Sequence, residues 1–312
     1  MDLRTLDQEE IILSSIEAEE AVSLERVWLV LSGLKTDDEI HTYQNKIGII
    51  FERFLNKCEV KGFSGQSRPP LYLQCTIAKS LSEYLWNSKP KRFGESFLLA
   101  DVIDAQLDPD VNRLVGTCVG LTALYSVLGV RAGLDLSVLA ASDHLLSRLR
   151  VGEEIIDIDH TDPQGFDCRN RKSSREFPLW TLAANMLNSR GLRNERSGNF
   201  LAAKEDYEKA ILINPEYANA YNNRGNMRFR DEDFDGAIAD YSEAIRLDPC
   251  LCEAYCNRGM AQQRLGRYPE AREDYRAAMS TNAEYSDARE CLRVLEDVER
   301  NKLPASECDD VI

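Results

Sequence analysis

The chain has 312 residues, 43% of them hydrophobic, which is enough to bury the cores of about two domains. Its formal net charge of −15 disfavours binding to nucleic acid or to an anionic membrane surface, because like charges repel at long range. The first residues lack a basic segment followed by an apolar one, and no stretch approaches ~18 uninterrupted apolar residues. We therefore expect a cytoplasmic protein with no nucleic-acid or membrane partner.

Nine cysteines are scattered along the chain. An odd number without a secretion signal predicts reduced thiols and no disulfide framework. Cys250, Cys252 and Cys256 form a C-x-C-x3-C cluster, but its spacing differs from the paired C-x2-C of structural zinc sites and no histidine lies near it. The acidic segment EEIIDIDHTD also lacks the spacing of a calcium-binding loop. We expect no metal site and no cofactor.

Apolar residues recur at helical spacing in the N-terminal region and predict helices over four ranges, 6–33, 36–57, 71–86 and 96–108. A further helix is predicted to begin at Cys118, with Thr117 as its N-cap and Gly133 as its stop. Cys118 would then lie in the first turn of that helix. There the helix dipole and the unpaired amide hydrogens favour a thiolate, and a backbone amide could stabilise an oxyanion.

Downstream, the apolar period changes from helical to alternating and predicts strands over 134–141, 144–151 and 155–161. A two-residue type II′ turn at Gly152 and Glu153 would place residue i opposite residue 305 − i. This register puts apolar side chains of both strands on one face, namely Leu145, Leu149, Val151, Ile156 and Ile158. The opposite face then carries His144, Arg148, Asp157 and Asp159.

The same register brings His144 within side-chain reach of Asp159, which lies diagonally across the hairpin at about 7–8 Å between backbones. Asp157 shares that face and is the alternative partner. His41, in a polar helical stretch, and His160, on the apolar face, are expected to be structural. A thiol at a helix start, a strand histidine and a carboxylate on the next strand form the set that thiol acyl transfer requires.

Three segments resemble the transglutaminase-like superfamily, in a bacterial branch often fused to repeats: GTCVGLTALYSVLGVRAGL, DHLLSRLRVGEEIIDID and HTDPQGF. The resemblance spans roughly Leu98 to Phe166. It implies a papain-like α+β fold for an N-terminal domain over 1–178. It also implies that Cys118 is the nucleophile, His144 the general base and Asp159 the orienting acid.

The C-terminal part repeats with a period of 34 residues. The period is kept by four sets: Gly191, Gly225 and Gly259; Ala203, Ala237 and Ala271; Tyr207, Tyr241 and Tyr275; Ala210, Ala244 and Ala278. The pattern resembles the tetratricopeptide repeat (TPR), in which small residues let two antiparallel helices approach and the tyrosine fills the gap. We expect an all-α solenoid of three units and a capping helix over 179–301, and a flexible tail over 302–312.

Such arrays bind peptides along the face formed by the first helix of each unit. Steps of 34 along these helices give Arg196, Arg230 and Arg264, and the neighbouring asparagines are Asn188, Asn222, Asn226 and Asn257. Guanidinium and amide groups suit the backbone and acidic side chains of an extended peptide, although solvated surface arginines are the alternative interpretation. Arg190, Arg224 and Arg258, directly before the glycines, are expected to pack or pair within the chain.

Two functions stay open. The first is a cysteine hydrolase or acyltransferase acting on a peptide or other amide bond, with the repeats recruiting a protein partner. The second is a catalytically inactive transglutaminase-like/TPR adaptor, in which only the repeats act. They differ at Cys118, because an enzyme needs an accessible thiol of low pKa whereas an adaptor tolerates a buried inert one. The acidic end of the tail is a further candidate to bind along Arg196, Arg230 and Arg264.

Overall fold

The computed structural model describes residues 9, 23–58, 60, 63–65, 68–90, 94–140, 144–162, 164–166, 175–282 and 285–301. The chain divides into two compact units, Met1–Met186 and Leu187–Ile312. The division falls inside helix α7 (Leu182–Arg196), a few residues after the boundary suggested by the sequence. The predicted tail over 302–312 and most of the first predicted helix lie outside the described residues.

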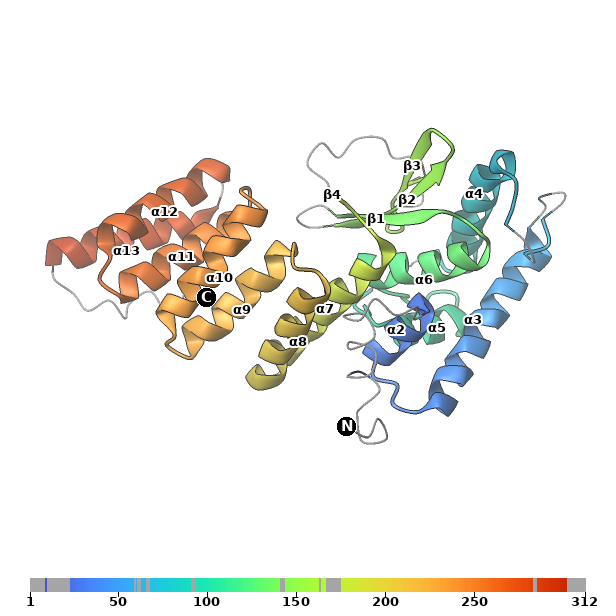
Figure 1. The fold of residues 1–312 in the computed structure, drawn as a ribbon, viewed down its shortest axis with the longest axis horizontal. Helices are drawn as coiled ribbons and strands as arrows, with labels where there is room; N and C mark the ends of the chain where they lie inside the picture. The colour runs from blue at the N-terminus through green and yellow to red at the C-terminus, as the bar shows by residue number, and fades with distance from the viewer. Residues whose placement is uncertain are drawn as a thin grey trace. The chain divides into compact units, whose positions relative to one another are not determined.

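The helices predicted over 36–57, 71–86 and 96–108 and from Cys118 are observed with similar bounds (Figure 1). The helix predicted over 6–33 was wrong at Ser23, whose backbone is extended and which is the N-cap of a shorter helix. The bounds of the helices are α2 Leu24–Leu31, α3 Asp37–Lys57, α4 Leu71–Ser88, α5 Leu99–Leu107 and α6 Cys118–Arg131. Helix α3 starts with a capping box, because the Thr36 hydroxyl accepts from the Glu39 amide while the Glu39 carboxylate accepts from the Thr36 amide. Helix α6 ends before Gly133, whose φ of 75° suits glycine.

A four-stranded antiparallel sheet follows α6, in the order β3-β2-β1-β4. The strands are β1 Leu136–Ala140, β2 Leu145–Val151, β3 Glu154–Ile158 and β4 Arg175–Phe177. The predicted hairpin register is confirmed: Arg148 pairs with Asp157 and Leu149 with Ile156, around a turn in which Gly152 has a φ of 63°. Strand β4 was not predicted, because three residues are too few to show an alternating pattern.

The first face of the sheet is apolar and packs on helix α6. A Cβ built on Gly129 of α6 would lie 2.5 Å from Leu136 Cδ1, so glycine permits this close approach. His160 stacks near Tyr125 of α6 with 4.3 Å between ring centroids, and its Nε2 lies 2.8 Å from the Ser147 hydroxyl. His160 is only 3% exposed and is therefore structural, as predicted.

The second unit consists of helix pairs (Figure 1). After α7 come α8 Phe200–Ile213, α9 Ala218–Arg230, α10 Phe234–Leu247, α11 Cys252–Arg264, α12 Tyr268–Thr281 and α13 Ser286–Asn301. The periodic tyrosines fill the gaps beside the periodic glycines: a Cβ on Gly225 would lie 2.6 Å from the Tyr241 ring. Tyr207, Tyr241 and Tyr275 are all fully buried.

Each repeat is also closed by a buried ion pair between its two helices. Arg190, Arg224 and Arg258 bind Asp206, Asp240 and Asp274 respectively, each pair 16 residues apart, and the aspartate side chains are 5–7% exposed. The predicted pairing role of these arginines is confirmed. The capping helix α13 packs its Ala288, Cys291 and Leu295 into the same apolar cluster as α11 and α12. Within the described part of the chain, no helix is long and apolar enough to cross a membrane.

Candidate functional site

The start of helix α6 carries Cys118 and is held by backbone contacts from a preceding segment. The Thr117 amide donates to the Ser96 carbonyl at 2.7 Å, and the Gly94 amide donates to the Gly116 carbonyl at 2.9 Å. A Cβ on Gly116 would lie 2.5 Å from the Ser96 oxygen, so only glycine allows these two segments to come together. The glycine before Cys118 therefore fixes where the helix begins.

The predicted side-chain cap at Thr117 was wrong. Thr117 occupies the N-cap position, with φ −73° and ψ 174°, but its side chain makes no capping hydrogen bond. The Thr117 hydroxyl is buried, and the described residues offer it no hydrogen-bond partner. The amides of the first turn are thus left without a side-chain acceptor from the N-cap, in a position where they can stabilise negative charge.

The hairpin of β2 and β3 brings His144 and Asp159 together, with 2.9 Å between His144 Nε2 and Asp159 Oδ1. His144 directly precedes β2 and Asp159 directly follows β3, so both lie at the same end of the hairpin. Thr161 completes the contact, because its hydroxyl and its amide both donate to Asp159 Oδ1, at 2.6 and 2.9 Å. Sequence reasoning did not find Thr161, although the predicted register, with residue i opposite residue 305 − i, would place it opposite His144.

The His144 imidazole also lies close enough to the Cys118 side chain for this cysteine to raise its pKa. Because Nε2 faces Asp159, the nitrogen left for the sulfur is Nδ1. Cys118 is half-buried and not fully enclosed. The structure therefore brings together all three residues that the sequence proposed as a triad.

The electrostatics of this cluster favour an imidazolium. The hydrogen bond to Asp159, followed by the interaction with Cys118, raises the pKa of His144 to about 9. Burial alone would raise the pKa of Asp159, but the hydrogen bonds from His144 and Thr161 outweigh burial and hold that pKa well below its usual range. At neutral pH, His144 is therefore protonated and Asp159 ionised.

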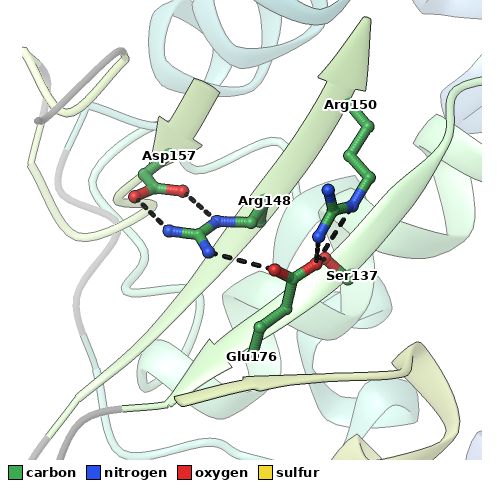
Figure 2. A network of polar contacts seen from close by, with 5 residues as sticks. All are labelled: Ser137, Arg148, Arg150, Asp157 and Glu176. Carbon is green, nitrogen blue, oxygen red and sulfur yellow. Dashed lines mark hydrogen bonds and ion pairs between the residues drawn. The ribbon is translucent and has the colours of Figure 1, made fainter. Parts of the chain in front are cut away.

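Asp157, the alternative partner of His144, is engaged elsewhere (Figure 2). Its carboxylate receives two hydrogen bonds from Arg148, Nε to Oδ1 at 2.7 Å and Nη2 to Oδ2 at 2.9 Å. The third contact of Arg148 goes to Glu176 of β4 at 3.0 Å. The choice left open by the sequence is thus resolved in favour of Asp159 as the carboxylate on His144.

The predicted groove asparagines lie on the first helices of the repeats and contact one another. Asn257 donates to Asn222 at 3.0 Å and to Asn226 at 3.1 Å, while Asn223 donates to Asn188 at 2.8 Å. Asn188 and Asn222 are 5% and 8% exposed, so their buried side chains act as acceptors that hold the more exposed Asn223 and Asn257 in place. Asn223 was missed by the sequence reasoning, although it precedes Asn257 by the repeat period of 34.

Of the three arginines predicted to line the peptide groove, two stack on aromatic rings of the preceding repeat. Arg230 lies over Phe200, with 3.1 Å from its guanidinium carbon to the ring centroid, and Arg264 lies over Phe234 at 5.1 Å. Arg196 and Arg230 are exposed and Arg264 is half-buried. The arginines therefore help to join successive repeats, a role that the sequence reasoning did not assign to them.

The cysteine cluster is dispersed by the fold. Cys250 is exposed, whereas Cys252 and Cys256 are buried, and the Cys256 sulfur lies 3.8 Å from that of Cys291. Burial, with a smaller effect of Glu253, raises the pKa of the Cys252 thiol to about 11. Among the residues that the structure describes, no group of three or more His, Cys, Asp and Glu side chains could hold a metal ion.

Comparison with protein-family models identifies three segments of the second unit. Residues 184–217 and 252–285 each match a model described as "Tetratricopeptide repeat", and residues 225–266 match one described as "TPR repeat". The chain therefore contains tetratricopeptide repeats, as the sequence predicted. The matched segments lie between 184 and 285, so the resemblance of residues 98–166 to the transglutaminase-like superfamily stays a prediction. A search of curated proteins gave no significant match.

Several solved structures are similar over part of the chain. The TPR domain of Arabidopsis OM64 is 26% identical and is matched over 38% of this chain and 97% of its own, with a TM-score of 0.37. The TPR2B domain of yeast Sti1, in a structure titled as an Hsp70 complex, is 29% identical over 38% and 97%, with a TM-score of 0.36. The first TPR of Spaghetti, bound to an HSP90 peptide, is 26% identical over 38% and 93%, with a TM-score of 0.36.

Proposed function

We propose that the protein is a thiol-dependent hydrolase or acyltransferase that acts on an amide bond, and that its repeats recruit the protein or peptide partner. The observation that carries this proposal is the continuous contact from Cys118 through His144 to Asp159. The residues occur in the order and chemistry that the transglutaminase-like resemblance implies. A papain-like α+β architecture for the N-terminal unit belongs to the same proposal, supported by a helix-borne cysteine beside an antiparallel sheet.

In the proposed reaction the Cys118 sulfur starts as a thiolate beside the His144 imidazolium, which holds the thiol proton and is stabilised by Asp159. The sulfur attacks the carbonyl carbon of the substrate, forming a C–S bond, and the first-turn amides of α6 stabilise the oxyanion. The C–N bond then breaks as His144 returns the proton to the leaving amine. Water or an amine attacks the thioester and gives its proton to His144, and the C–S bond breaks to release the acid or the new amide and to restore the Cys118 thiolate beside the imidazolium.

The selective test is the rate at which iodoacetamide alkylates Cys118 as a function of pH, read by peptide mass spectrometry. Cys58 is the internal control, since it is a half-buried free thiol of the same unit. We expect Cys118 to react at least about tenfold faster than Cys58 at pH 6–7, and this excess to disappear in His144→Ala, because the thiolate is the reactive form and the imidazolium of His144 would stabilise it. A Cys118 as slow as Cys58 and indifferent to His144 contradicts the enzyme and favours the inactive adaptor.

The repeats have the groups to bind an extended acidic peptide. The partly exposed amides of Asn223, Asn226 and Asn257 offer donors and acceptors to a peptide backbone, and the exposed guanidinium groups of Arg196 and Arg230 suit acidic side chains. Asn188, Asn222 and Arg264 would act mainly by holding these groups in place.

This part of the proposal is tested with a random-peptide library presented to the full-length protein. We expect selected peptides to be enriched in Asp and Glu. The triple variant Arg196→Glu, Arg230→Glu and Arg264→Glu should bind them at least about tenfold more weakly, because it converts attraction into repulsion at the two exposed arginines and removes the supporting Arg264 guanidinium. Selected peptides without acidic enrichment, or an unchanged affinity in the triple variant, would refute the acidic-peptide groove.

A further inference from the structure

The second face of the sheet carries a network of four charged side chains and one hydroxyl (Figure 2). Arg148 lies at its centre, on β2, and is hydrogen-bonded to Asp157 on β3 and to Glu176 on β4. Glu176 also accepts from Ser137 of β1 at 2.7 Å and from Arg150. Arg148 is thus the residue through which β2, β3 and β4 are linked on this face.

The contact between Arg148 and Asp157 is specific for one register. The two residues are direct partners across the hairpin, and their side chains are 20% and 14% exposed. A planar guanidinium binds a carboxylate through two parallel hydrogen bonds only when both approach in this orientation. A slip of β3 by one residue would place Asp157 on the apolar face and an isoleucine opposite Arg148, which would break both hydrogen bonds between the guanidinium and the Asp157 carboxylate.

The same register positions the candidate triad. The paired residues of the hairpin end at Ser147 and Ile158, directly before Asp159. The contacts of His144 with Asp159 and Thr161 lie just beyond this end, so they depend on the register that Arg148 and Asp157 help to hold. Arg148 also occupies the Asp157 carboxylate, which would otherwise compete with Asp159 for the imidazole from two residues away.

We propose that Arg148 is a positioning residue for the triad: its paired hydrogen bonds to Asp157 fix the hairpin register and reserve His144 for Asp159. This inference rests on the proposed function. Arg148 acts through Asp157, its partner across the hairpin. Glu176 helps to orient the Arg148 guanidinium by accepting a hydrogen bond from its Nη1.

The test compares three variants by the NMR titration of His144 and by the pH profile of Cys118 alkylation. Arg148→Gln combined with Asp157→Asn removes the ion pair without leaving either charge unpaired. Arg148→Lys keeps the charge but cannot form the paired hydrogen bonds. Arg150→Gln is the matched control, because it removes an ion pair to Glu176 and leaves the link between Arg148 and Asp157 intact.

We expect the double variant to lower the His144 pKa by at least one unit and to slow Cys118 alkylation at neutral pH by about tenfold, because one pKa unit is a factor of ten. Arg148→Lys should shift both in the same direction by less, and Arg150→Gln should change neither. A parent-like profile in the double variant, or an equal effect of Arg150→Gln, overturns the inference. If the double variant does not fold, a parent-like profile in Arg148→Lys overturns it instead.

The outcomes separate this inference from the proposed function. If alkylation of Cys118 in the otherwise unaltered protein is indifferent to His144→Ala, the triad itself fails and Arg148 has nothing to position. If that dependence is present but the variants at Arg148 leave it unchanged, only the positioning role is refuted.

Discussion

The two units of this chain use polar side chains in opposite ways. In the repeats, each buried contact recurs at a period of 34 residues, as with the three arginine–aspartate pairs. In the N-terminal unit, Cys118, His144 and Asp159 occur once and meet only because one hairpin has one register. A periodic contact can be lost from one repeat and kept in the neighbouring repeats, whereas the triad has no second copy. Stability in the repeats should therefore be distributed, and function in the first unit concentrated.

The largest expected effect on stability is the loss of one repeat ion pair. Arg258→Met leaves the nearly buried Asp274 carboxylate without its guanidinium, which should cost about 3 kcal/mol of unfolding free energy. Arg224→Met should cost less, because Arg228 also reaches Asp240 at 3.2 Å. Far-ultraviolet circular dichroism during urea unfolding measures both. Equal costs at the two positions would show that Arg228 does not compensate.

The second effect concerns pH and the N-terminal unit alone. Because the folded pKa of His144 is about 9, above its ordinary 6.5, its contribution to stability is complete below pH 6.5 and is lost as the pH rises through 9. We expect a loss of about 2 kcal/mol across this interval, allowing for partial exposure. All three tryptophans, Trp28, Trp86 and Trp180, lie in this unit, so their fluorescence reports its unfolding. The result is contradicted if His144→Gln shows the same pH dependence.

Replacing glycine by alanine should change the free energy of unfolding in opposite directions in the two units. Gly225→Ala drives a methyl group into the Tyr241 ring, 2.6 Å away, and should destabilise the repeats by roughly 1.5 kcal/mol. Gly48→Ala, within helix α3, meets only Arg131 at 3.7 Å and should stabilise the first unit by roughly 0.5–1 kcal/mol. Circular dichroism and tryptophan fluorescence, followed together, separate the two changes. Stabilisation by Gly225→Ala would refute the tight helix contact.

The smallest effect is at the start of helix α3. Thr36→Ala removes the acceptor of the Glu39 amide and should cost about 1 kcal/mol, measured by tryptophan fluorescence in urea. Glu39→Gln is the control, since it retains a side-chain oxygen for the Thr36 amide and should cost less. A larger cost for the control would mean that the carboxylate charge, and not the hydroxyl cap, stabilises this helix.

The features predicted from the sequence are those with a period. Two-residue alternation on either side of Gly152 was enough to predict the register that pairs Arg148 with Asp157. A period of 34 identified the repeats and the pairing role of Arg258. The contact between Cys118 and His144 has no such signal, because it depends on how helix α6 packs against the sheet.

Other features were missed for identifiable reasons. Thr117 was expected to cap α6 because of its residue type, but its hydroxyl is buried and makes no hydrogen bond to the helix amides. Strand β4 is too short to show alternation. The stacking of Arg230 on Phe200 could have been predicted from the sequence, because the aromatic residues Phe200, Phe234 and Tyr268 follow the same period of 34 residues as the arginines. It would have required comparing the periodic arginines with the periodic aromatic residues.

The most direct test of the triad is the titration of His144 by NMR in the full-length protein. The chain has only three histidines, so the His144 signal is assigned from the variant that lacks it. The account predicts a pKa near 9 that falls toward 6.5 in Asp159→Asn and falls by a smaller amount in Cys118→Ala. A His144 pKa near 6.5 in the unaltered protein, unchanged by either substitution, would contradict it.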